Sequence, residues 1–219
     1  MEDKQHHVYI FDLWFTLIYG LTTDPIATFW QILTGKDDPC PDEFIRECLT
    51  IDISYPDAYA QAIAGKFGFT ATPAVLCQFR KILRDEQSAL GLYPDTLEVI
   101  DELRRRGHRT ALASNLWPFA VRTVDKLISL RHRFDHLACS FQVGHSKPSR
   151  ELFDNVTGAL GVPARHCTMV GDSLASDIRA SLAVGMNAVF IDRNGSRGRP
   201  SQKVPGGVSV VATLSQLLS

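Results

Sequence analysis

Apolar residues along the chain gather in short, nearly continuous runs separated by polar and turn-forming segments. Runs in which almost every position is apolar are typical of strands in a parallel sheet that helices cover on both faces. The pattern therefore predicts a buried parallel sheet. The four clearest runs are 8–12 (VYIFD), 109–114 (RTALAS), 167–172 (CTMVGD) and 187–192 (NAVFID), and 136–140 (HLACS) is a weaker fifth.

Helical patterns alternate with these runs. The segment 95–106 carries apolar residues at helical spacing and is followed by Gly107 as a stop signal. Further helices are predicted from Pro118 towards residue 129, from Ser149 to Gly161, and from about residue 176 to 184. Alternation of strand and helix predicts a doubly wound α/β domain, in which ligands bind at the carboxyl ends of the strands.

Residues 20–89 interrupt this alternation, because their punctuation predicts helices only. Helix starts are indicated at residues 24–25, 41–42, 56–57 and 72–73, each of which contains a proline, and glycines follow near 35, 68 and 91. We therefore divide the chain into an α/β core of residues 1–19 and 90–219 and a helical insertion of residues 20–89. An insertion after the first strand would lie over the carboxyl edge of the sheet, which favours a lid over a decoration remote from any site.

Composition narrows the class of protein. The chain has 219 residues, a net charge of −1 and no long apolar run, so no basic footprint favours nucleic acid and no segment is expected to span or bind a membrane. Its five cysteines include no C-x-x-C pair. Reduced thiols and a cytoplasmic location are the expectation.

Polar residues follow several of the apolar runs, and their types suit phosphoryl chemistry. Carboxylates are the ligands that Mg²⁺ prefers, and such a metal lowers the repulsion between an anionic nucleophile and a phosphate. A lysine and a hydroxyl can hold phosphate oxygens where charge develops. The candidates are Asp12, Ser114, Asn115, Lys147, Asp172 and Asp177.

Four motifs occur in a fixed order: DLWFTL at 12–17, LASN at 112–115, KP at 147–148 and GDSLASD at 171–177. Together they resemble the motifs of the haloacid dehalogenase (HAD) superfamily, and the resemblance extends over nearly the whole chain. It implies a hydrolase with a Rossmann-like α/β core and a helical cap between the first and second motifs.

The resemblance also implies catalytic roles for three residues. Asp12 would be the nucleophile that forms an aspartyl intermediate. Thr16 would support the loop that follows the nucleophile, and Lys147 would neutralise both the nucleophile and the phosphate.

Binding roles are implied in the same way. Ser114 would bind the oxygens of the transferred group with Asn115 beside it, and Trp14 would lie at the substrate. Mg²⁺ would be the cofactor. Its implied ligands are Asp12, the backbone carbonyl of Trp14, Asp172 and Asp177.

Trp14 departs from the family pattern. Phosphatase members carry an aspartate there that protonates the leaving group and activates water, whereas an indole only donates hydrogen bonds. Phe15 also replaces a small residue. General acid–base catalysis contributes about 10²–10⁴ in rate, so its loss would slow the hydrolysis of alkyl phosphates. Acyl phosphates, or a substrate that brings its own acid, would be affected less. A packing role for both aromatic residues in the loop or at the cap interface is the alternative.

Two other functions stay open. The family's dehalogenases carry an aromatic residue at this position, but they use no metal, and they hold an arginine early in the cap, where this chain has none before Arg46. A catalytically weak relative that binds a phosphorylated ligand or a protein is the third reading. The retained carboxylates favour a Mg²⁺-dependent phosphohydrolase that acts on a small phosphorylated metabolite, as a monomer or homodimer.

Two segments near the motifs carry weaker signals. Trp117 follows the second motif closely and would either shape the substrate pocket or pack in the core. The basic, turn-rich segment 193–207 is expected to be a mobile surface loop near the mouth of the sheet.

Overall fold

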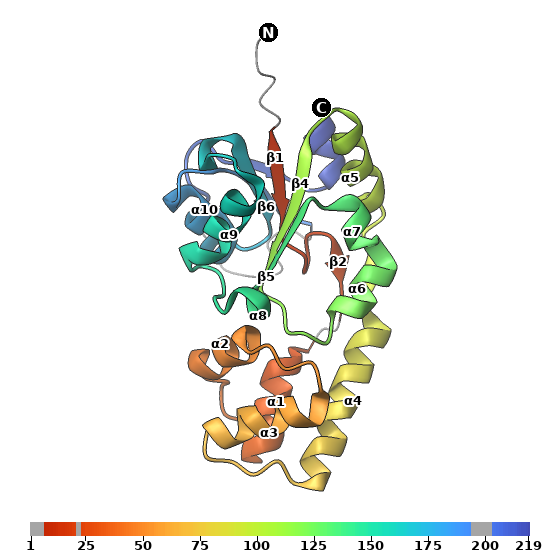
Figure 1. The fold of residues 1–219 in the computed structure, drawn as a ribbon, viewed down its shortest axis with the longest axis vertical. Coiled ribbons are helices and arrows are strands. Elements are labelled where there is room, and N and C mark those ends of the chain that lie inside the picture. The colour runs from red at the N-terminus through yellow and green to blue at the C-terminus, as the bar shows by residue number, and fades with distance from the viewer. Residues whose placement is uncertain (1–6, 21–22, 194–202) are drawn as a thin grey trace.

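The computed structural model describes residues 7–20, 23–193 and 203–219. Figure 1 shows a sheet flanked by helices, with a second group of helices beyond one end of the strands. The predicted α/β architecture with an inserted helical region is confirmed.

The sheet has six parallel strands in the order β5-β4-β1-β6-β7-β8. The first strand lies in the middle, between the strands that precede the second and fourth motifs. This reversal of strand order on either side of β1 is where doubly wound proteins bind ligands. The strands are β1 (Val8–Phe11), β4 (Arg109–Ser114), β5 (His136–Cys139), β6 (Cys167–Gly171), β7 (Asn187–Ile191) and β8 (Ser209–Val211).

Alternate strand residues face two apolar layers, which explains why the runs are apolar at nearly every position. Phe11, Leu112 and Val170 belong to one buried cluster, whereas Ile10 and Met169 belong to the other. Helices cover both faces (Figure 1). They are α5 (Thr96–Arg105), α6 (Val121–Ile128), α7 (Leu130–Arg133), α8 (Ser140–Val143), α9 (Arg150–Leu160) and α10 (Ala180–Ala183).

The insertion contains the four expected helices, α1 (Pro25–Thr34), α2 (Asp42–Thr50), α3 (Pro56–Lys66) and α4 (Pro73–Ala89). Their ends follow the predicted punctuation. Asp24 accepts hydrogen bonds from the first-turn amides of α1, and Gly35 ends that helix in the left-handed conformation. The interior of the insertion is aromatic, and its buried rings join the apolar cluster on one face of the sheet.

Two predictions about elements need correction. The helix expected from Pro118 begins at Val121, because residues 118–120 form a turn whose Phe119 ring packs on Tyr59 of α3. The helix expected from residue 176 is a π-helical turn from Leu174 to Arg179 followed by the short α10. The segment 193–207 lies partly outside the described residues.

Sequence reasoning did not predict the short pair β2 (Ile18–Tyr19) and β3 (Gly91–Leu92). These strands pair antiparallel and connect the core to the insertion. Sequence reasoning also missed α7, α8, β8 and the single turns Ala164–His166 and Leu214–Leu218.

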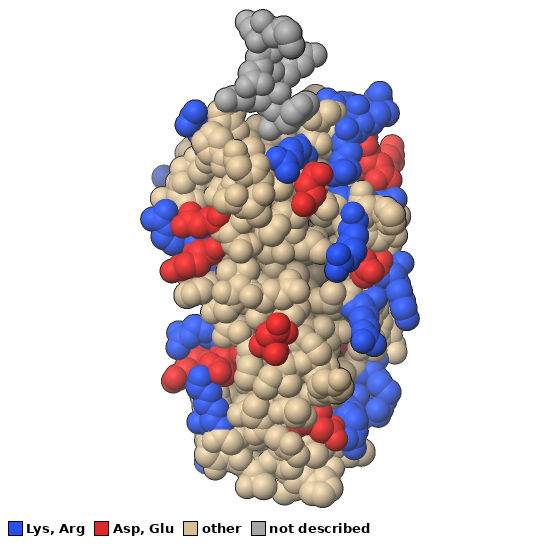
Figure 2. All heavy atoms as spheres, viewed as in Figure 1, with Lys and Arg blue, Asp and Glu red and all other residues tan. Residues whose placement is uncertain are grey.

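None of the helices in the described ranges combines the length and apolar content that crossing a bilayer requires. On the face drawn in Figure 2, basic and acidic side chains are interspersed.

Candidate active site

Three neighbouring strands deliver polar groups to one edge of the sheet. Asp12 follows β1, Ser114 ends β4 on one side of it, and Asp172 follows β6 on the other. The register of the strands places these ends level, because Phe11 pairs with Leu112 and with Val170. The ends of the strands that carry the first, second and fourth motifs therefore lie together at one edge of the sheet.

Lys147 lies at the centre of this group and is buried. Its Nζ donates to Asp12 Oδ1 and to Asp177 Oδ1, each at 2.6 Å. The amine predicted from the third motif is therefore in direct contact with the predicted nucleophile.

Asn115 fixes the backbone that carries this lysine. Its Oδ1 accepts from the Lys147 amide at 2.7 Å, and its Nδ2 donates to the Lys147 carbonyl at 3.0 Å. Both ends of the Asn115 amide are thus engaged with the protein. Contact between Asn115 and substrate stays a prediction.

Three carboxylates could hold a metal ion. Asp12, Asp172 and Asp177 each offer an oxygen, and these oxygens lie within 4.8 Å of one another. Gly171 makes the approach possible, because a Cβ at that position would collide with the Asp177 carboxylate. The backbone amide of Ser173 donates to Asp177 Oδ2 at 2.9 Å and orients that carboxylate.

Burial and charge act against each other in this cluster. Burial raises the pKa of Asp177 to about 6; Lys147 opposes this shift, whereas the Asp12 carboxylate adds to it. Burial alone would lower the pKa of Lys147, but its attraction to Asp12 and Asp177 and its hydrogen bonds to them raise it above its ordinary value. The lysine therefore stays an ammonium group at neutral pH.

Two buried hydroxyls at the site have no hydrogen-bond partner among the described residues. They are Ser114 Oγ and Thr16 Oγ1, and both residues are fully buried. Buried hydroxyls are normally paired, so the Ser114 hydroxyl, at the strand end next to Asp12, suits a bound polar group. The Ser114 hydroxyl and the Lys147 ammonium group are both hydrogen-bond donors, so together they suit a bound anion.

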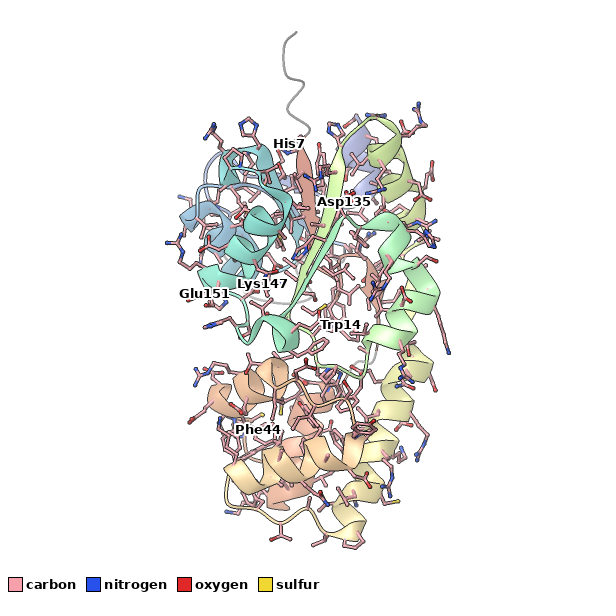
Figure 3. All side chains as sticks on the ribbon, in the orientation of Figure 1. His7, Trp14, Phe44, Asp135, Lys147 and Glu151 are labelled. Atoms are coloured by element: carbon pink, nitrogen blue, oxygen red, sulfur yellow. The ribbon has the colours of Figure 1, made fainter. Side chains whose placement is uncertain are left out.

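The indole of Trp14 packs beside the two points where the chain enters and leaves the insertion. A Cβ built on Gly20 would come within 2.8 Å of the Trp14 ring and 3.3 Å of Leu90. The ring therefore lies against the Gly20 backbone, next to Leu90. Figure 3 labels Lys147 and Trp14 near the boundary between the sheet and the inserted helices.

Trp117 links the second motif to the insertion. Its side chain is buried, and its Nε1 donates to both carboxylate oxygens of Glu86 in α4, at 3.0 and 3.2 Å. Burial raises the pKa of Glu86 to about 7, although the hydrogen bond from Trp117 acts in the opposite direction. Sequence reasoning missed Glu86, because a glutamate inside an amphipathic helix normally predicts a solvent-facing position.

The comparisons agree with the motif order. The model of the haloacid dehalogenase-like hydrolase family matches residues 6–185. The phosphoserine phosphatase of Thermus thermophilus is 36% identical over 110 residues, which cover 49% of this chain and 43% of the relative. The glyceraldehyde 3-phosphate phosphatase of Methanothermobacter thermautotrophicus is 27% identical over 129 residues, which cover 57% of this chain and 56% of the relative.

The alignments with these two curated relatives therefore span about half of their length. A solved structure extends the similarity to almost the whole chain. It is that of a HAD phosphatase from Thermococcus onnurineus, with 26% identity, a TM-score of 0.62, and coverage of 96% of this chain and 95% of that protein.

Proposed function

Because the chain belongs to the haloacid dehalogenase-like hydrolase family, we propose that it is a Mg²⁺-dependent phosphohydrolase that acts on a small phosphorylated metabolite. The observation that carries the proposal is the contact of one buried ammonium group with two carboxylates, 2.6 Å from each, inside a group of three carboxylates. The phosphatases among its relatives support the same reaction class.

The residues present fit Mg²⁺. Asp12, Asp172 and Asp177 supply hard oxygen ligands, and the backbone carbonyl of Trp14 is the further ligand implied by the family resemblance. When bound, the ion neutralises phosphate charge and polarises the phosphoryl group. The cluster holds three carboxylates and one ammonium, so a divalent cation would also reduce its negative charge.

In the first step, an Asp12 oxygen attacks phosphorus, and the bond between phosphorus and the leaving oxygen breaks. Lys147 holds the nucleophile and balances the charge of the phosphoryl oxygens, and Ser114 is the proposed hydroxyl donor to those oxygens. In the second step, water attacks the phosphorus of the aspartyl phosphate. Inorganic phosphate is released, and the Asp12 carboxylate is restored.

Trp14 limits which leaving groups are suitable. An indole at residue 14 supplies no proton, so the leaving oxygen of an alkyl phosphate would have to take its proton from solvent. Carboxylate and phenolate leaving groups need less help, since they are weaker bases. We therefore expect this protein to prefer acyl and aryl phosphates to alkyl phosphates. The ratio of the two rates should exceed the ratio in an enzyme that has the acid by about 10²–10⁴.

The insertion is proposed to be a cap domain of residues 20–89 that covers the site as a lid. The connecting strand β2 follows the first motif directly and pairs with β3, which returns the chain to the core, and the Trp14 ring packs against Gly20 next to Leu90. A lid at the carboxyl edge of the sheet would enclose a small metabolite and contribute its specificity. A monomer or homodimer, in the cytoplasm, remains the expectation for the protein.

The cluster of three carboxylates disfavours the dehalogenase alternative. Displacement of a halide needs a nucleophilic carboxylate but no metal, and so gives no reason for Asp172 and Asp177 beside Asp12. The aromatic Trp14 is accounted for by its packing on Gly20. The remaining alternative is a protein that binds a phosphorylated ligand without hydrolysing it, and the experiment below distinguishes the two.

The test is hydrolysis of acetyl phosphate and p-nitrophenyl phosphate with and without Mg²⁺. Activity should require the metal and fall at least about 10³-fold in Asp12→Asn, because the nucleophile is lost. Asp38→Asn, which changes an exposed acid on the insertion, should keep wild-type activity. Chloride release from a 2-chloro acid without metal, or the appearance of phosphatase activity only in Trp14→Asp, would refute the proposal.

A further inference from the structure

Arg193 lies at the end of β7, and its side chain is turned inward rather than into a surface loop. The side chain is only 6% exposed. Its guanidinium stacks on Tyr93, with Cζ 3.8 Å from the ring centroid. A buried arginine in a stacked arrangement is held in one geometry, which suits it to fix other groups.

The guanidinium holds the backbone of the loop that carries the predicted nucleophile. Nη2 and Nε both donate to the Thr16 carbonyl, at 2.7 and 3.0 Å. The same group pairs with Asp95, and Nη2 lies 2.9 Å from Asp95 Oδ1. Arg193 therefore joins the first motif to the start of α5.

Asp95 is itself anchored. Its Oδ2 accepts from the backbone amide of Leu214 at 2.6 Å, in the C-terminal turn. The pair is largely buried, because the Asp95 side chain is 12% exposed. The Arg193–Asp95 pair is therefore held by the start of α5 and by the C-terminal turn at Leu214.

The loop has a conformation that needs such support. Phe15 has a φ of 59°, in the left-handed region that a side chain with a Cβ enters at a cost of about 1–2 kcal/mol. The amides of Leu17 and Ile18 both donate to the Leu13 carbonyl and close a tight turn. The Thr16 carbonyl accepts two hydrogen bonds from the Arg193 guanidinium, which hold this turn in place.

We propose that Arg193, oriented by Asp95, is a positioning residue that fixes the loop from residue 12 to residue 17 in its reactive geometry. It acts through the Thr16 backbone and does not touch the reacting atoms. The catalytic part of this inference rests on the proposed phosphohydrolase function. A displacement of about 1 Å in such a loop can lower a rate by about 10²-fold.

The test compares Arg193→Lys and Arg193→Gln with Arg133→Lys. Lysine keeps the positive charge but has no fork that can bind a carbonyl and a carboxylate together. Arg133 is a matched control, because it also joins a carboxylate (Asp101) to a backbone carbonyl (Ile128), away from the site. Arg193→Gln leaves Asp95 buried without its cation and can fail to fold, so Arg193→Lys is the decisive variant.

The first readout is amide hydrogen exchange at residues 17 and 18. Exchange should be about tenfold faster in Arg193→Lys and unchanged in Arg133→Lys, whatever reaction the site performs. The second is steady-state kinetics with acetyl phosphate and Mg²⁺, in which kcat should fall about tenfold or more with KM within about threefold.

Unchanged exchange at residues 17 and 18 in folded Arg193→Lys would overturn the positioning role. Faster exchange with an unchanged kcat would overturn its catalytic consequence. If the wild-type protein hydrolyses no phosphate, the proposed function fails, whereas the exchange measurement still decides whether Arg193 holds the loop.

Discussion

The buried carboxyl of Glu86 should make the stability of the protein fall as pH rises. Glu86 is 2% exposed, and its side-chain hydrogen-bond donor is the Trp117 indole. Burial raises its pKa from 4.5 to about 7 in the folded chain. The substitution Glu86→Gln removes the titration while keeping the shape and an oxygen that can accept from Trp117.

The size of the effect follows from the two pKa values. A group whose pKa is higher in the folded than in the unfolded chain stabilises the fold fully below its unfolded value, near pH 4.5. That contribution is lost as pH rises through the folded value, near 7. At 1.36 kcal/mol per pH unit, the total is about 3 kcal/mol, of which about 2–3 kcal/mol falls between pH 5 and pH 8.

The assay is urea unfolding of the wild type and Glu86→Gln at several pH values, followed by tryptophan fluorescence. Other titrating groups are common to both proteins, so the difference in unfolding free energy isolates Glu86. Asp85→Asn is the control, because it removes the same charge one position away on the exposed face of α4. A wild-type-to-Gln difference that stays constant within about 0.5 kcal/mol from pH 5 to pH 8 would refute the reasoning.

Three further predictions concern the site and the opposite edge of the sheet. Phe15→Gly should be more stable to unfolding than Phe15→Ala by about 0.5–1 kcal/mol. Both variants lose the ring and only alanine keeps the strain at φ 59°, but the greater backbone entropy of unfolded glycine offsets part of that gain; equal stabilities would contradict this. Asn115→Ala should lower the free energy of unfolding by about 2 kcal/mol and should also lower kcat, because both hydrogen bonds to the Lys147 backbone disappear. Asn115→Asp should keep the hydrogen bond from the Lys147 amide and so retain a higher kcat than Asn115→Ala. Equal kcat values in the two variants would contradict a role of Asn115 in fixing the Lys147 backbone. Burial and two neighbouring histidines lower the pKa of His7, so its stabilisation is present above its unfolded pKa, near 6.5, and is lost as pH falls; unfolding free energies of wild type and His7→Gln that run parallel from pH 7 to pH 5 would argue against it.

The main strands were predictable because each is buried on both faces. Uniform apolar runs such as 167–172 leave few alternatives, and they end in the polar residues that form the site. The order of four motifs then predicted that Asp12, Lys147 and Asp177 would meet, and hydrogen bonds join them. Proline and glycine punctuation predicted the inserted helices for a local reason, namely backbone conformation at the helix ends.

What sequence reasoning missed depends on long-range contacts. The strands β2 and β3 have two residues each, too few for a periodic signal, and each forms only by pairing with residues that lie 72 and 74 positions away in the sequence. Arg193 stands in a segment of glycine, serine and arginine that predicts a solvated loop, yet its guanidinium binds Thr16 far away in the sequence. The late start of α6 at Val121 follows from the packing of Phe119 against Tyr59.

The pairing of Ile18 with Leu92 and of Tyr19 with Gly91 brings the two ends of the insertion together, so the insertion could be replaced by another segment. Since its two ends lie side by side, a replacement segment would close the same connection, and the entropy of closing such a connection depends only weakly on the length of the segment. A different helical segment could be grafted there without a change in the order of the strands in the sheet. The graft would have to supply its own apolar cover for Trp117 and Phe119, which the present insertion shields from water.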